Sequence, residues 1–155
     1  MGSVERVKGF LEAAGVGVRV IEMEKTTRTA ELAAQAIGCP VGAIVKSLVF
    51  LADGQAVLVL ASGDRRVDTA RVQELLDVEQ VEIARADVVK ELTGYAIGGV
   101  PPVGHDHPMP VLMDRNLYRF ETVWAAAGSP FAVFPIGPAR LAAISQAKLV
   151  DIAGE

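Results

Sequence analysis

The pattern of apolar and polar residues predicts two helices in the first quarter of the chain. Apolar positions recur every three or four residues over 4–14 and again over 31–37, as they do on one face of a helix. Thr29 precedes the second run and is a suitable N-cap for it. Between the two helices, valine alternates with other residues over 16–20, which predicts a short strand.

The strongest strand pattern follows the second helix. Residues 44–51 and 55–61 are two runs rich in β-branched and aliphatic residues, and Asp53-Gly54 joins them. This dipeptide suits the two-residue turn of a β-hairpin, because both of its positions tolerate a positive φ. The two runs are therefore expected to be adjacent antiparallel strands.

The rest of the chain alternates short helical and short strand patterns. Helices are predicted over 68–76, 87–92 and 138–144, and strands over 81–84, 111–113, 122–126, 131–134 and 149–152. Residues 94–110 read as a loop. No repeat or linker divides residues 1–155, so we expect one compact α/β (α+β) domain with a mixed, largely antiparallel sheet and packed helices.

Charge and composition restrict the possible partners. The chain has 155 residues, of which 51% are hydrophobic, and 15 Lys and Arg against 19 Asp and Glu give a net charge of −4. The apolar content predicts a folded protein. The acidic balance excludes an electrostatic grip on a long stretch of nucleic acid, so no DNA partner is expected and any RNA is touched locally.

Cysteine and charge spacing also predict the compartment. Cys39 is the single cysteine and cannot close an intramolecular disulfide, which favours a cytoplasmic protein. The longest stretch without acidic or basic residues, 122–139, is interrupted by glycines and prolines, so no membrane span is predicted.

Lys46 is the first candidate site residue. In the predicted strand its side chain shares a face with Ile44, Leu48 and Phe50, so a charge interrupts an apolar row. Two interpretations remain open at this point. The ammonium group either reaches solvent at the end of the strand or lines a pocket for an anion.

The loop that contains Gly98, Gly99, Pro101, Pro102 and Gly104 is the second candidate. Its glycines allow a ligand to approach the main chain and expose amide N–H groups, whereas its prolines stiffen the loop. An ordinary turn is the alternative interpretation. His105-Asp106-His107 follows, but alternating residues in a short loop fix no tetrahedral geometry, so no metal and no other cofactor is predicted. His105 is kept as a candidate because it follows the glycine loop directly.

Three segments read in order along the chain resemble one known family: Val45-Lys46-Ser47-Leu48-Val49-Phe50, Thr93-Gly94-Tyr95 and Gly98-Gly99-Val100-Pro101-Pro102-Val103-Gly104-His105. Further matching positions are Thr29-Ala30-Glu31-Leu32-Ala33-Ala34, Asp114 and Ala126-Ala127-Gly128, followed by Pro138-Ala139-Arg140-Leu141. Together they are similar to the YbaK/EbsC family, the free-standing relatives of the prolyl-tRNA synthetase editing domain. The resemblance extends over nearly the whole chain.

The resemblance implies a trans-acting deacylase that hydrolyses the ester of mischarged tRNA, with tRNA-Pro among the candidate substrates. It implies that Lys46 contacts the phosphate or ribose at the 3′ end of the tRNA. It also implies that the loop from Gly98 to Gly104 supplies main-chain groups around the terminal adenosine and the aminoacyl carbonyl. Water would attack the ester with help from the ribose hydroxyl of the substrate, so the enzyme need only position the reactants.

The site implied by the resemblance has two groups of residues. Lys46, Gly98 and Gly99 are the expected catalytic residues, and the expected substrate-binding residues are Thr29, Pro101, Pro102, Gly104, His105, Asp114 and Gly128. Two positions depart from the family pattern, since Ala126 stands where some relatives carry serine and Arg28 lies beside the expected amino-acid pocket. A partner synthetase is a further expectation. The alternative function is a non-catalytic module that binds a nucleotide or a tRNA 3′ end.

Overall fold

The five predicted helices form in the predicted order, and so do the predicted strands except the one over 16–20, while two short strands near residues 66 and 153 are additional. The computed structural model describes residues 2–154. The helices are α1 (Ser3–Ala14), α2 (Ala30–Ile37), α3 (Thr69–Leu76), α4 (Ala86–Thr93) and α5 (Pro138–Ser145), with the 3₁₀ turns η1 (Val41–Ala43) and η2 (Arg115–Arg119). The strands are β1 (Ile21–Glu22), β2 (Ile44–Ala52), β3 (Gln55–Ser62), β4 (Arg66–Val67), β5 (Val81–Ile83), β6 (Val111–Asp114), β7 (Val123–Ala126), β8 (Ala132–Ile136), β9 (Lys148–Val150) and β10 (Ala153–Gly154). The stretch from α4 to β6 is a loop, as predicted.

One mixed sheet organises the fold. Its strand order is β1-β8-β7-β2-β3-β6-β9, and β5 pairs with β2 in addition. Over the described residues four strand pairs of this sheet are antiparallel and three are parallel, and β4 with β10 forms a separate antiparallel ladder. The predicted fold class, a mixed and largely antiparallel sheet with packed helices, is therefore confirmed.

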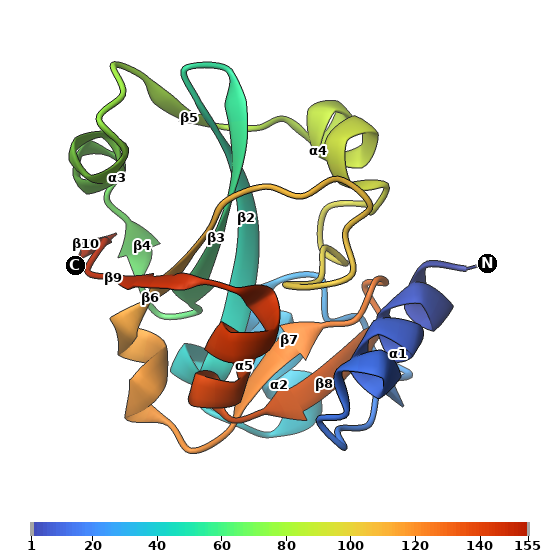
Figure 1. Cartoon of the computed structure of the whole chain (residues 1–155). Coiled ribbons are helices and arrows are strands. Elements are labelled where there is room, and N and C mark those ends of the chain that lie inside the picture. Colours follow the sequence, from blue (N-terminus) through green and yellow to red (C-terminus); the bar gives the residue numbers. More distant parts are fainter. Residues whose placement is uncertain (1, 155) are drawn as a thin grey trace.

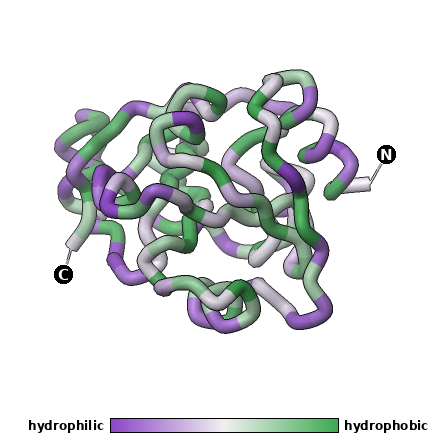
Figure 2. The backbone as a smooth tube through the Cα atoms, turned by 90° about the horizontal axis from the view of Figure 1, so that it is seen from below, coloured by the Kyte–Doolittle hydropathy of each residue, from purple (hydrophilic) through white to green (hydrophobic). Residues whose placement is uncertain are grey.

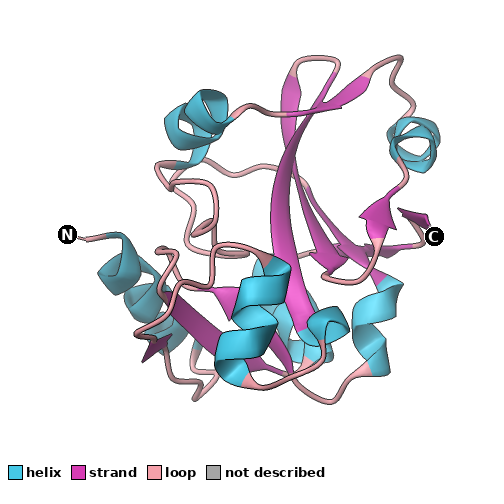
Figure 3. Cartoon of the chain, turned by 180° about the vertical axis from the view of Figure 1, so that it is seen from behind, coloured by secondary structure: helices cyan, strands magenta, loops and turns pink. Residues whose placement is uncertain are grey.

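The long β2–β3 hairpin is the central feature of the architecture. Figure 1 shows it extending away from a lower layer that contains β7, β8 and the helices α1, α2 and α5. Helices α3 and α4 lie on either side of its far end, and the view from behind in Figure 3 shows the same arrangement. Figure 2 shows the two ends of the chain on opposite sides of the molecule, with hydrophobic and hydrophilic segments alternating along the backbone.

The hairpin turn has the geometry that its sequence predicts. Asp53 and Gly54 have φ angles of 48° and 84°, and Ala52 pairs with Gln55 across the turn. The Asp53 carboxylate also accepts hydrogen bonds from the main-chain N–H groups of Glu79 and Gln80, at 3.2 and 2.9 Å. The turn is thus tied to the segment that leads into β5.

The strand predicted over 16–20 is wrong. The observed strand is β1, and it pairs with the edge strand β8 through Ile21 and Glu22. Gly17 has a φ of 68°, which breaks the extended conformation that an alternating strand needs. The Val16 carbonyl instead accepts a hydrogen bond from Arg140, so this segment is held by a side chain from α5.

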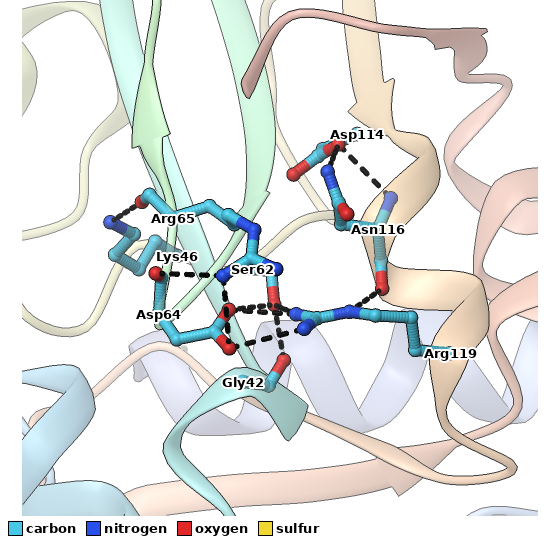
Figure 4. Close-up of polar contacts among 8 residues, drawn as sticks. All are labelled: Gly42, Lys46, Ser62, Asp64, Arg65, Asp114, Asn116 and Arg119. Carbon is cyan, nitrogen blue, oxygen red and sulfur yellow. Dashed lines mark hydrogen bonds and ion pairs between the residues drawn. The ribbon is translucent and has the colours of Figure 1, made fainter. Parts of the chain in front are cut away.

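A polar network fixes the end of β3 to η2 (Figure 4). The Arg119 guanidinium donates hydrogen bonds of 2.7 and 2.8 Å to the Asp64 carboxylate and the Ser62 hydroxyl. Ser62 in turn donates to the carbonyl of Gly42. The hydrogen bond from Arg119 is the main cause that lowers the pKa of Asp64. The network holds the turn after β3 in one position.

Replacing Gly54 by alanine is expected to destabilise the protein by about 1 kcal/mol, because a side chain at this left-handed φ is strained. An added Cβ would meet no other atom within 4 Å, so the effect comes from the backbone alone. Gly9→Ala is the matched control, since Gly9 lies in α1 with equally open space. Urea unfolding should show Gly9→Ala stabilised by about 0.5–1 kcal/mol. Equal effects of the two substitutions would contradict this account of the turn.

The Asp64–Arg119 ion pair predicts a pH dependence of stability. The folded-state pKa of Asp64 lies below its unfolded value of about 3.9, so the stabilisation is present above that value and disappears as the pH falls through the folded pKa. The difference in free energy of unfolding between wild type and Asp64→Asn should be constant above about pH 5 and shrink below about pH 4. Urea unfolding at a series of pH values measures it. A difference that grows on acidification would show that the pair is not stabilising.

Candidate active site

A cavity opens beside β2, where this strand has no partner on one side. On that side, β7 pairs with Ile44 and Val45, and β5 pairs with the segment that begins at Phe50. Between these two ladders the edge of β2 borders a cavity of about 390 Å³. Its lining includes residues from β2, from the start of α2, from the ends of β7 and β5, and from the Gly98 loop.

Lys46 lies on β2 between two apolar clusters. Ile44 belongs to a small cluster with α2, whereas Phe50 belongs to a cluster with β3 and α3. The Lys46 side chain therefore separates the two clusters on one face of the strand, as its spacing predicts. It lines the cavity rather than a strand end at the surface.

The ammonium group of Lys46 is held by a main-chain carbonyl (Figure 4). Its Nζ donates a hydrogen bond of 2.6 Å to the carbonyl of Arg65, in the turn that the Arg119 network fixes. Burial lowers the pKa of Lys46, and the negative charges of Glu31 and Asp64 oppose this effect. Among the described residues Lys46 forms no ion pair. Its charge is thus positioned but not neutralised.

Thr29 lines the cavity and is the N-cap of helix α2. Its Oγ1 accepts a hydrogen bond of 3.2 Å from the N–H of Leu32, so the predicted N-cap is confirmed. Arg28 and Glu31 also line the cavity. The mouth therefore carries both signs of charge.

The glycine pair of the loop is packed against protein on both sides. A Cβ added to Gly98 would lie 2.8 Å from the Cβ of Arg28, and one added to Gly99 would lie 2.8 Å from the Cα of Ser129. Gly98 lines the cavity, whereas the N–H of Gly99 donates to the carbonyl of Ala96. The two glycines therefore allow the loop to pack closely against Arg28 and Ser129.

The second half of the loop is anchored to α1. The carbonyl of Gly104 accepts hydrogen bonds from Tyr95 Oη at 2.7 Å and from Arg6 at 3.2 Å. His105 Nε2 lies 2.7 Å from the carbonyl of Pro101, and burial is the main cause that lowers the pKa of His105. Gly104, His105 and Pro102 border a separate hollow of about 220 Å³ behind the loop. Pro101 and these three residues therefore lie outside the cavity lining.

Asp114 and Gly128 also lie outside the lining. Asp114 is buried at the end of β6, and its carboxylate accepts a hydrogen bond of 3.0 Å from the N–H of Asn116 at the start of η2. Gly128 has a φ of 94°, and a Cβ there would lie 2.6 Å from the carbonyl oxygen of Ser3. Of the ten expected site residues, the structure brings Lys46, Thr29 and Gly98 together at the cavity.

The sequence pattern does not single out several of the cavity residues as site residues. Ser47 follows Lys46 on β2, and Ile83 and Ile97 stand at the mouth with 60% and 55% of their surface exposed. The exposed isoleucines come from separate elements, so only the folded structure reveals them as a pair. Ala126, the departure from the family pattern, also lines the cavity.

Two further features of the described residues concern metals and membranes. No three His, Cys, Asp or Glu residues in the described part of the chain lie close enough to hold a metal ion. Within residues 2–154 no helix has the length and apolar character that crossing a membrane requires.

Comparison with known proteins identifies relatives over most of the chain. It is 34% identical to the uncharacterized protein YwhH of Bacillus subtilis over 135 residues, which are 86% of this chain and 85% of YwhH. It is 36% identical over 89 residues, or 57% of its length, to the proline–tRNA ligase of Lactobacillus gasseri, and this match spans 16% of the ligase.

Solved structures share the fold. The crystal structure of a candidate trans-editing enzyme for prolyl-tRNA synthetase superposes with a TM-score of 0.92 and 44% identity, covering 100% of this chain and 99% of that one. The family described as the aminoacyl-tRNA editing domain matches residues 24–144, which include the whole lining of the cavity. The chain therefore belongs to the aminoacyl-tRNA editing domain family.

Proposed function

We propose that this protein is a trans-acting aminoacyl-tRNA deacylase, with mischarged tRNA-Pro as its first candidate substrate. The observation that carries the proposal is the Lys46 ammonium, which lines the cavity and forms no ion pair among the described residues. An unneutralised, partly buried cation in a cavity favours an anionic ligand. We infer that this ligand is the phosphate at the tRNA 3′ end.

The rest of the cavity suits the aminoacyl-adenosine that follows this phosphate. Gly98 lines the cavity, and the exposed side chains of Ile83 and Ile97 offer apolar surface to the terminal base. Arg28 and Thr29 border the opposite wall. A tRNA end can thus be held by local contacts, in agreement with a net charge of −4.

Hydrolysis in this arrangement requires positioning more than acid or base side chains. A water oxygen forms a bond to the ester carbonyl carbon, and the bond from that carbon to the ribose oxygen breaks. The free hydroxyl of the same ribose assists the proton transfer from the water to the departing ribose oxygen. Lys46 fixes the phosphate and the Gly98 loop contacts the carbonyl, so the reactants meet in one geometry.

The link with prolyl-tRNA rests on the relatives. The partial match is to a proline–tRNA ligase, and the superposed crystal structure is that of a candidate trans-editing enzyme for prolyl-tRNA synthetase. We propose accordingly that the protein acts in the cytoplasm on tRNA released by prolyl-tRNA synthetase, which is its candidate protein partner.

Lys46→Ala is expected to lower kcat/KM for deacylation by about 100-fold, because one charged contact to the substrate is lost. The measurement is release of labelled amino acid from a panel of mischarged tRNAs that includes tRNA-Pro. Lys8→Ala is the control, since it removes an exposed lysine from α1, outside the cavity. A Lys46→Ala enzyme within threefold of wild type would refute the role of this residue.

The alternative function, a non-catalytic module for a nucleotide or tRNA end, predicts binding without hydrolysis. It draws on Ala126, which stands in the cavity wall without a hydroxyl. If wild type leaves every mischarged tRNA intact while Lys46→Ala weakens tRNA binding, this alternative replaces the deacylase.

The dependence of tRNA binding on salt provides a separate test. Contact with only one or two phosphates of a single-stranded end predicts a slope of log Kd against log salt concentration below about 2, since each phosphate contributes about 0.7. Fluorescence titration between low and moderate salt measures the slope. A value above about 5 would indicate many phosphate contacts and contradict recognition of the 3′ end alone.

A further inference from the structure

Ser47 is the residue of β2 that faces the gap between the two flanking ladders. On this side, β7 pairs with β2 as far as Val45, and β5 pairs with it from Phe50 onward. Within the part of the chain that the structure describes, neither ladder reaches Ser47. It lines the cavity at the gap.

The main-chain groups of Ser47 point toward the gap. Neighbouring residues of a strand direct their N–H and C=O groups to opposite sides, and residues two apart direct them to the same side. The carbonyl of Val49 accepts a hydrogen bond of 2.9 Å from Ala84, which leads out of β5. Ser47, two residues earlier, therefore presents both its N–H and its C=O to the open side.

The Ser47 hydroxyl is also available. Its Oγ is buried and has no hydrogen-bond partner among the described residues. On its face of the strand the neighbours are Val45 and Val49, both members of the main hydrophobic core, so nothing polar on this strand face can satisfy it. Buried hydroxyl groups are normally hydrogen-bonded, so one that borders a cavity without a partner is available to a ligand.

We propose that Ser47 binds the aminoacyl group of the substrate in the way that a strand residue pairs with a residue of the neighbouring strand. The assignment rests on the proposed deacylase function. An aminoacyl ester carries an α-ammonium and a carbonyl on either side of one Cα, as a single residue of a strand does. The Ser47 C=O and Oγ accept hydrogen bonds from the ammonium, and the Ser47 N–H donates to the ester carbonyl.

This arrangement separates two tasks along β2. Lys46 and Ser47 are consecutive, so their side chains point to opposite faces of the strand. Lys46 would hold the phosphate and Ser47 the aminoacyl group, with the ester between them at the strand edge. Because Ser47 contacts only atoms common to all amino acids, it recognises the presence of a free α-amino group and not the identity of the side chain.

The test compares Ser47→Ala with wild type on an aminoacyl-tRNA and on the same tRNA after N-acetylation. Loss of a hydrogen bond to a charged group is expected to lower kcat/KM for the free aminoacyl substrate by about 10- to 100-fold. On the acetylated substrate the two enzymes should differ by less than about threefold, because the ammonium is gone. Ser47→Thr keeps the hydroxyl, and threonine is β-branched and therefore favourable in a strand. This variant should restore the activity.

A merely structural role for Ser47 would lower the activity on both substrates equally, and that result would overturn the assignment. No loss on either substrate would overturn it as well. Failure of the deacylase proposal looks different, since wild type would then hydrolyse neither tRNA.

The main-chain contact can be measured without catalysis. Hydrogen exchange of the Ser47 N–H is followed with and without adenosine that carries an amide-linked aminoacyl group at its 3′ position. Slower exchange at Ser47 on binding supports the proposed pairing. Binding of this compound with unchanged exchange at Ser47 would refute it, whether or not the protein is an enzyme.

Discussion

The incomplete pairing of β2 is the constraint on which the rest of the site depends. Along one side this strand is matched residue for residue with β3, from Val45 to Ala52. Along the other side it is matched only near its two ends. A strand that is rigidly held on one edge and open on the other gives a fixed rim to a cavity, because the paired edge prevents the open edge from collapsing inward.

The same constraint explains how a lysine can stand in the centre of a sheet. Placing an ammonium between apolar clusters is unfavourable, and burial lowers the pKa of Lys46; the open edge and the carbonyl of Arg65 offset part of that cost. The carbonyl is available because Arg119 and Asp64 hold the turn after β3. Burial of Lys46 thus lowers the stability of the fold, and the contact between Arg119 and Asp64 offsets part of this loss. Such a compensation is common at functional sites.

Local patterns in the sequence predict the parts of the fold that local interactions determine. The Asp53-Gly54 turn, the Thr29 cap and the position of Lys46 in an apolar row all depend on residues close together in the chain. The open edge of β2 does not depend on nearby residues. It depends on where β7 and β5 end, and these strands lie far away in sequence. For the same reason, local patterns do not predict that Ser47 borders the cavity. They also do not predict that most of the proline-rich half of the loop lies outside its lining. The sequence predicts that Gly98 and Gly99 face a ligand, yet in the structure they pack against Arg28 and Ser129.

Helix α1 supports the cavity, although it lies outside the part of the chain that matches the editing-domain family. It lies before residue 24, where the match to the family begins. Arg6 nevertheless donates a hydrogen bond to the carbonyl of Gly104, and the carbonyl of Ser3 packs closely against Gly128. Both of these glycines belong to loops that meet at the contact between Gly99 and Ser129, beside the cavity wall. The N-terminal helix therefore supports two loops beside the cavity, and a fragment limited to the family segment would keep every lining residue while losing that support.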